Sequence, residues 1–208
     1  MTDSPFAGLK LSDMTCADGQ IRSVGEPPRA VSVTEVMRQG TAVAFDAEAT
    51  VKPLRKRERY AHYAHSAVFV EARVDEDFGT ILVTRVVSAI AGGRILNPKT
   101  ARSQILGAIV WGIGMALHEE SVIDHTFGRF ITHNLADYHV PVNADARDIE
   151  VIFVDEQDDF VNPLGAKGLG EIGLVGTAAA IANAVFHATG RRIRDLPITP
   201  DKLLMASL

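Results

Sequence analysis

Residues 165–173 read Gly-Ala-Lys-Gly-Leu-Gly-Glu-Ile-Gly and run directly into an apolar segment at 174–188. Five of the chain's 17 glycines lie between Gly165 and Gly176. Glycine tolerates positive φ and lets other groups approach the backbone closely. A glycine-rich turn that opens a helix also offers free N–H groups to an anion. The pattern therefore predicts a ligand-binding turn followed by a buried helix.

The carboxylate of Glu171 lies at the mouth of this predicted helix. An acidic side chain at such a position can simply stabilise the helix N-terminus. It can also serve as a general base beside a bound ligand. The residues alone leave both interpretations open.

The same stretch matches Gly-x-Gly-x-x-Gly at Gly168, Gly170 and Gly173. A nicotinamide-binding interpretation requires a buried strand directly before the first glycine and further βαβ units after the helix. Residues 158–163 instead indicate a polar turn, and little chain follows the helix. The dinucleotide interpretation is kept as an alternative that lacks its expected surroundings.

Upstream, a loop at 92–100 leads into a predicted helix at 101–120 that is apolar on nearly all sides. Such a helix is expected to be buried. Arg94, Lys99, Thr100 and the helix N-terminus suit phosphate or pterin oxygens, although an ordinary strand–helix connection has the same appearance. Gln104 is expected to be a buried amide that bonds either the backbone or a cofactor.

Strands are predicted at 67–75 and 80–88, joined as an antiparallel hairpin, and at 127–133 and 148–155. The predicted fold is α+β, with short antiparallel or mixed strands packed on two buried, glycine-containing helices. Two parts are expected. Residues 1–59 form an N-terminal segment with a short helix at 32–40 and a basic loop at 52–59, and residues 60–208 form the main domain.

Composition narrows the classes of function. The 208 residues are 47% hydrophobic, enough for a real core, and the net charge of −5 argues against nucleic acid or an anionic membrane as partner. Cys16 is the only cysteine, so the chain alone can form no internal disulfide and hold no iron–sulfur cluster. No apolar run of membrane-spanning length is expected, and no signal peptide is recognised at the start.

Several motifs, in one order, resemble the large subunit of the xanthine dehydrogenase and aldehyde oxidase family, the molybdenum hydroxylases. They are Asn97-Pro98, the run Ser-Gln-Ile-Leu-Gly at 103–107, the run Gly-Ile-Gly-Met-Ala-Leu-His-Glu-Glu at 112–120, the glycine-rich turn, and the ending at 189–200. The resemblance covers about residues 60–208. The Glu-Ile-Gly form of the turn is closer to bacterial aldehyde oxidases.

The resemblance implies a C-terminal part of a molybdopterin-binding domain in an enzyme that oxidises aldehydes or N-heterocycles by hydroxylation with water-derived oxygen. It implies molybdenum on a pterin, in bacteria commonly a cytosine dinucleotide, with Glu171 as general base. Because the pterin supplies the sulfur ligands, no protein metal ligand is expected. The cofactor-binding residues it implies are Arg94, Ile95, Leu96, Asn97, Pro98, Lys99, Thr100, Gln104, Lys167, Gly168, Leu169 and Gly170.

The resemblance also implies partners: the remainder of the large subunit, and other chains that carry 2Fe-2S and FAD centres. The expected compartment is the cytoplasm, or the periplasm if the chain is exported with a partner subunit. The fragment is expected to be inactive alone. A non-catalytic module of this fold that serves in binding or assembly is the second alternative.

Overall fold

The computed structural model describes residues 5–25, 27–40 and 60–206, together with residues 44, 46, 48 and 50. The chain divides into two compact units, Met1–Lys52 and Pro53–Leu208. Each unit is described by itself. The basic loop at 52–59, and the domain boundary expected beside it, lie outside the described residues.

The first unit is a small antiparallel sheet followed by a helix. A 3-10 turn, η1 (Leu11–Asp13), precedes β1 (Met14–Ala17), β2 (Gln20–Ser23) and β3 (Ala30–Ser32), which pair in that order. Helix α1 (Val33–Gln39) follows at once, and the Ser32 hydroxyl accepts a hydrogen bond of 3.1 Å from the Glu35 N–H. The expected short helix at 32–40 is confirmed, and Ser32 is its N-cap.

The second unit contains a mixed three-stranded sheet. Strand β4 (His65–Asp75) pairs antiparallel with β5 (Thr80–Ala91), which confirms the expected hairpin, and β5 pairs parallel with β8 (Asp148–Phe153). The order β4-β5-β8 leaves β4 and β8 as the two edges of this sheet. Alternate residues of β4 are half-buried and exposed, as expected where a sheet has only one covered face.

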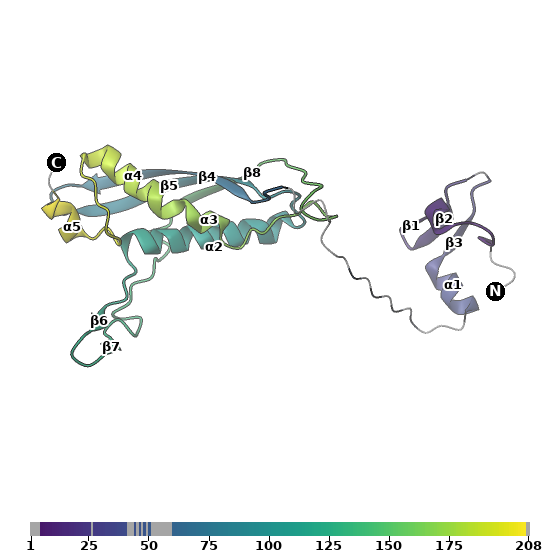
Figure 1. Ribbon diagram of the computed structural model, residues 1–208, viewed down its shortest axis with the longest axis horizontal. Coiled ribbons are helices and arrows are strands. Elements are labelled where there is room, and N and C mark those ends of the chain that lie inside the picture. The colour runs from purple at the N-terminus through teal and green to yellow at the C-terminus, as the bar shows by residue number, and fades with distance from the viewer. Residues whose placement is uncertain are drawn as a thin grey trace. The chain divides into compact units, whose positions relative to one another are not determined.

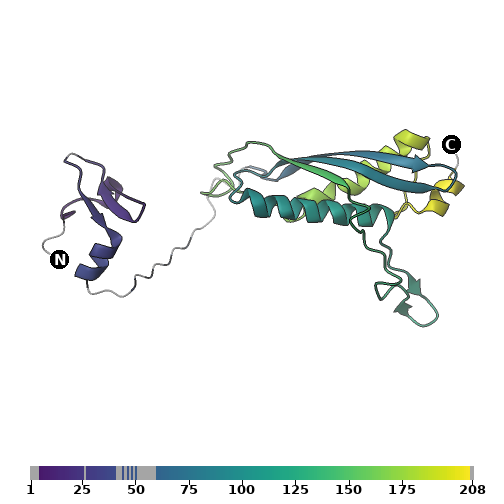
Figure 2. The same cartoon turned by 180° about the vertical axis from the view of Figure 1, so that it is seen from behind.

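Three helices lie on the same face of the sheet: α2 (Pro98–Leu117), α3 (Ile172–Val175) and α4 (Thr177–Thr189) (Figures 1 and 2). Helix α2 begins earlier than expected because Asn97 caps it with Pro98 in its first turn. The single helix expected at 174–188 is two helices that meet at Gly176. A last short helix, α5 (Pro200–Met205), ends the described chain.

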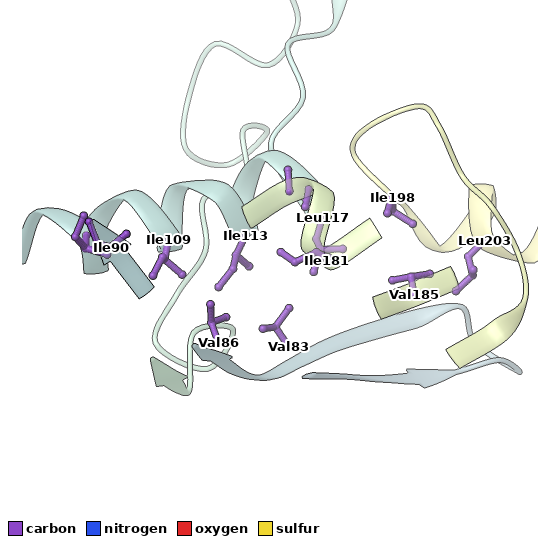
Figure 3. Close-up of a cluster of buried hydrophobic side chains, with 13 residues drawn as sticks. Val83, Val86, Ile90, Ile109, Ile113, Leu117, Ile181, Val185, Ile198 and Leu203 are labelled. Atoms are coloured by element: carbon purple, nitrogen blue, oxygen red, sulfur yellow. The ribbon is translucent and has the colours of Figure 1, made fainter. Parts of the chain in front are cut away.

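The core is formed between the sheet and these helices (Figure 3). Ile105, Ile109 and Ile113 recur every four residues along α2 and are fully buried. On the opposite side of α2, Trp111 and Met115 are 52% and 47% exposed. The expectation that this helix is buried all round is therefore wrong. Its apolar outer side has no partner among the described residues.

Residues 118–147, here called the arm, leave the C-terminal end of α2 and extend away from the helices (Figure 1). They contain only a two-stranded ribbon of β6 (Ile123–Asp124) and β7 (Arg129–Phe130). The strand expected at 127–133 is thus reduced to two residues. The arm also exposes large apolar side chains, among them Phe127, Ile131 and Leu135. With so little apolar burial of its own, it depends on hydrogen-bonded turns for its shape.

The run Ile172–Thr189 is long and apolar enough to cross a membrane by length and composition alone. This differs from the expectation that no run reaches that length. The run is divided at Gly176, and Ala178, Ile181 and Val185 of α4 belong to the core beside the sheet. These contacts place one side of α4 in the core, and 33% of the run is buried.

Stability of the second unit should depend on the inner face of α2. Ile113→Ala removes a fully buried side chain and should lower the free energy of unfolding by about 2–5 kcal/mol. The control Met115→Ala, on the exposed side of the same helix, should cost far less. Urea unfolding followed by the fluorescence of Trp111, the only tryptophan, measures both. Equal losses in the two variants would contradict the packing described here.

Candidate functional site

Two main-chain segments that are distant in the sequence meet at one end of the sheet. Gly93 and Ala166 form an isolated antiparallel bridge. The Arg94 N–H donates to the Gly165 carbonyl at 2.8 Å, and the Lys167 N–H donates to the Gly92 carbonyl at 2.9 Å. The loop that follows β5 and the glycine-rich turn are thereby held side by side.

Backbone conformation favours glycine on both sides of this contact, and close approach requires it at Gly93. Gly93 and Gly165 both have positive φ, at +66° and +69°. A Cβ atom on Gly93 would also collide with the Gly165 carbonyl oxygen. An L-residue at 93 would therefore suffer both backbone strain and a clash with main chain.

Side chains reinforce the same contact. The Lys167 ammonium lies 2.6 Å from Glu156 Oε1 and 3.2 Å from Asp158 Oδ2, and the Lys167 side chain is only 7% exposed. The other Glu156 oxygen, Oε2, accepts a 2.8 Å hydrogen bond from the Gly93 N–H. Glu156 therefore links the two segments through one carboxylate. We call Lys167, Glu156 and Asp158 the lysine clamp.

The clamp shifts the pKa values of its members. The hydrogen bond from Lys167, with that from the Gly93 N–H, holds the pKa of Glu156 below its usual range. Burial alone would raise the pKa of Asp158, but hydrogen bonds from Lys167 and from backbone N–H groups outweigh it and lower that pKa. The hydrogen bond to Glu156 raises the pKa of Lys167 against the opposing effect of burial. All three groups are charged at neutral pH.

A cleft of about 250 Å³ opens beside the joined segments. Most of the residues expected to bind a cofactor line it, together with two alanines that were not among them: Arg94, Ile95, Leu96, Asn97, Thr100, Ala101, Gln104, Ala166, Lys167 and Leu169. Pro98, Lys99, Gly168, Gly170 and Glu171 are not part of this lining. The fold thus brings together two of the sequence segments selected independently.

The first turn of α2 differs from its expected role. The Asn97 side chain accepts from the N–H groups of Lys99 and Thr100 at 3.1 and 3.2 Å, and Pro98 has no N–H. These N–H groups are therefore already satisfied, and the helix N-terminus is not the free anion site expected. The exposed side chains of Arg94 and Lys99 carry the positive charge there, and within the described residues neither has a hydrogen bond or ion pair.

Gln104 is also placed differently from the expectation. It lies on an exposed side of α2 at the wall of the cleft, not in the core. An exposed amide can hydrogen-bond to water, so the protein fold does not require it there.

Glu171 occupies the N-cap position of α3, but its side chain accepts no capping hydrogen bond. It is exposed and makes no hydrogen bond or ion pair within the described part of the chain. The interpretation of Glu171 as a hydrogen-bonded helix cap therefore finds no support. The described residues do not give Glu171 the water-poor surroundings expected for a general base.

Glu156 and Asp158 are site residues that the sequence did not point to, although both contact Lys167. A buried lysine needs counter-charges, but nothing in the sequence shows that Lys167 is buried. The dinucleotide interpretation loses its required strand, because Ala166 forms only an isolated bridge before Gly168. Over the residues described, no group of three or more His, Cys, Asp or Glu side chains could hold a metal ion.

Comparison with known proteins identifies the family. A sequence profile described as the molybdopterin cofactor-binding domain matches residues 3–147, more than half of the chain. The chain belongs to this family. The match begins well before residue 60, the expected start of the resemblance, and ends before the glycine-rich turn.

Two relatives and one solved structure place this molybdopterin-binding chain among molybdenum hydroxylases. It is 51% identical over 147 residues to the aldehyde oxidoreductase molybdenum-binding subunit PaoC of Escherichia coli, a match covering 71% of this chain and 20% of that one. A probable subunit of xanthine dehydrogenase from Bacillus subtilis is 34% identical over 206 residues, covering 97% and 27%. Quinoline 2-oxidoreductase of Pseudomonas putida superimposes with a TM-score of 0.74 at 27% identity, covering 92% and 25%. The matched part is thus only about a fifth to a quarter of the length of these relatives.

The lysine clamp gives a pH dependence that can be measured. Glu156 and Asp158 have lowered pKa values, so their contribution to stability is present above their ordinary pKa values of 4.5 and 3.8 and is lost as the pH falls through the folded-state values. The raised pKa of Lys167 gives a contribution present below 10.5 and lost as the pH rises through its folded-state value. Lys167→Met should therefore lower Tm strongly between about pH 5 and 10, and the difference from wild type should shrink below about pH 4.

The matched control is Lys99→Met, which removes an exposed lysine without a partner among the described residues and should leave Tm nearly unchanged at every pH. Melting curves by circular dichroism from about pH 3 to 8 provide the comparison. A Tm difference for Lys167→Met that persists undiminished at the acidic end of this range would show that the clamp is not ionic.

Proposed function

We propose that this chain is the part of a molybdenum hydroxylase large subunit that forms one wall of the molybdenum–pterin site and carries the general base Glu171. Aldehydes are the substrate class best supported, because the 51% identical relative is an aldehyde oxidoreductase subunit. N-heterocycles are the second class, supported by the likeness to quinoline 2-oxidoreductase. The observation that carries the assignment of the base is the unengaged carboxylate of Glu171, placed two residues after a wall of the cleft.

The residues of the cleft fit a pterin with phosphates. Its walls are largely apolar and suit a flat ring, and Arg94 in the lining offers phosphate oxygens a cation without a partner among the described residues. Lys99, outside the lining in the first turn of α2, is a second exposed cation nearby. A Cβ added at Gly168 or Gly170 would meet no atom of this chain within 4 Å. That open space leaves room for another molecule to approach the backbone. When bound, the molybdenum–pterin group would supply the acceptor for two electrons.

The proposed contacts to that group come from residues 94–100, from Gln104 and from the turn at 167–170. Lys167 would contribute through its main chain and its aliphatic stem, because its ammonium is engaged with two carboxylates. Gln104 has an amide without a partner in the described chain at the cleft wall, which is available to the polar edge of a pterin. The cytosine dinucleotide form of the cofactor is part of this proposal.

Glu171 would accept the proton of the water-derived nucleophile and orient the substrate. A glutamate works best as a base when its pKa approaches the operating pH, and exclusion of water raises it. In this chain Glu171 is exposed. Its cover would be another part of the large subunit, because the match spans only 20% of the aldehyde oxidoreductase relative.

The exposed apolar surface supports the same partner. The outer side of α2, with Trp111 and Met115, and the arm, with Phe127 and Leu135, present large apolar side chains. Apolar surface of this kind marks contacts with other polypeptide. Iron–sulfur and flavin chains would complete an assembly in the cytoplasm, or in the periplasm after export with a partner.

A non-catalytic binding or assembly module remains the second candidate, since the cleft lining does not include Glu171. Molybdenum, pterin and nicotinamide analysis of the purified assembly separates the candidates. Molybdenum with pterin supports the enzyme, neither group supports the assembly module, and bound nicotinamide supports the dinucleotide alternative.

The proposed function requires more polypeptide than this chain provides. The purified 208-residue chain should oxidise no aldehyde, because Glu171 lacks its cover and the electrons have no exit. Co-expression with the missing portion of the large subunit and with the redox subunits should restore turnover. Dye-linked aldehyde oxidation by the chain and by the assembly measures this. Full turnover by the chain alone would refute it.

Glu171→Gln in the assembled enzyme tests the role of Glu171 as the base. The substitution preserves side-chain size, and only the small interaction with the helix dipole, about 0.3–1 kcal/mol, should be lost from stability. Molybdenum content should be unchanged, while kcat should fall by about 10²–10⁴-fold, as when a general base is removed. The acidic limb of the pH–rate profile should also disappear.

Glu120→Gln is a suitable control, because Glu120 is an exposed carboxylate in the same unit with no hydrogen bond or ion pair to the described residues. It should leave the rate near that of wild type. A Glu171→Gln enzyme with full molybdenum and near-normal kcat would end the assignment of Glu171 as the base.

A further inference from the structure

We infer that Lys167 acts as a positioning residue and not as a charged ligand of the cofactor: through Glu156 and Asp158 it fixes the loop after β5 against the glycine-rich turn. This inference rests on the proposed function for its link to the cofactor. Its structural part, the hold of the clamp on the two segments, stands on the chain's own contacts.

The Lys167 ammonium is already paired with the carboxylates of Glu156 and Asp158. Its two carboxylate partners lie at 2.6 and 3.2 Å, and 7% of the side chain is exposed. To bind a phosphate, the ammonium would have to leave two carboxylates that are themselves only 29% and 17% exposed. Leaving a charge buried without its partner is costly. Arg94 and Lys99 are exposed cations nearby and need break no such contact.

Glu156 links the glycine-rich turn to the loop after β5. One of its oxygens accepts from the ammonium of Lys167, the residue after Ala166, and the other accepts from the Gly93 N–H. The carboxylate thus ties together the two segments of the isolated bridge between Gly93 and Ala166. Gly93 then leads into residues 94–97, which all line the cleft. Displacement of Glu156 should therefore release this wall of the cleft.

Lys167 also changes the net charge beside the cleft. Glu156 and Asp158 place two negative charges next to a cleft proposed to receive phosphates. The positive charge of Lys167 offsets one of these two negative charges, so the three groups together carry a net charge of −1. Without the lysine, both partly buried carboxylates, whose side chains are 29% and 17% exposed, would repel an anionic group in the cleft. The lysine would thus favour the cofactor without touching it through its ammonium.

Amide hydrogen exchange on the full 208-residue chain tests the structural part. The three amides that join the segments belong to Gly93, Arg94 and Lys167. In Lys167→Met and in Glu156→Ala these amides should exchange about ten- to a hundredfold faster than in wild type, relative to amides in the middle of β4 and β5. Asp155→Asn changes an exposed carboxylate of the same loop that has no hydrogen bond or ion pair to the described residues, and it should leave them unchanged.

Two exchange results would overturn the inference. Unchanged protection of the three amides would show that the clamp does not hold the segments. Equal acceleration at these amides and throughout the sheet would show a general loss of stability and not a positioning role. Both results are independent of any cofactor.

Molybdenum retention after gel filtration of the co-expressed assembly tests the link to the cofactor. Lys167→Met should retain several-fold less molybdenum than wild type. The double variant Lys167→Met/Glu156→Gln should recover part of the loss, because one of the two unneutralised carboxylates is removed. If the Lys167 ammonium instead bound the cofactor directly, the second substitution would bring no recovery, and the inference would fail.

The two failures are distinguishable. A wild-type assembly that takes up no molybdenum would refute the proposed function, while the exchange measurement would still decide whether the clamp positions the loop. Normal molybdenum in Lys167→Met, together with faster exchange at the three amides, would separate the clamp from cofactor binding and overturn the inference about retention.

Discussion

The site depends on a short main-chain contact between the loop after β5 and the glycine-rich turn. Two backbone hydrogen bonds, from Arg94 to Gly165 and from Lys167 to Gly92, place the ends of distant segments side by side. Two glycines in positive φ make the contact close enough. Without it, α2 and α3 could still pack on the sheet, but the residues that line the cleft would have no common wall.

A buried lysine makes this contact specific. Ordinary surface ion pairs contribute little to stability. A poorly exposed lysine between two carboxylates is held firmly in place, because moving it away would leave buried charges without a partner. Glu156 also accepts from a backbone N–H, so main chain and side chain are fixed together. An ionic contact that would have little effect on the surface here determines the position of a loop.

Local patterns allowed much of the fold to be predicted. The alternation in β4 and β5, the Ser32 cap and the apolar periodicity of α2 each reflect interactions between near neighbours in sequence. The outer side of α2 could not be predicted, because Trp111 is as apolar as a core residue and only contact with a partner decides its burial. Glu156 and Asp158 were missed for a related reason: their pairing with Lys167 depends on a bridge between residues far apart in the chain. The glycine-rich turn was recognised, yet the sequence could not show that Glu171 would be left without a capping hydrogen bond.

The sheet β4-β5-β8 ends on both sides in a strand whose outer backbone groups are not paired by any strand among the described residues. The outer edge of β4, an 11-residue strand whose pairing with β5 shifts register between Glu71 and Ala72, is a template on which another strand can add. Natural proteins normally cover or interrupt such edges. Copies of the chain whose sheet edges are uncovered can join edge to edge, which is a route to aggregation. In the proposed assembly, polypeptide that covered β4 and β8 would close this route.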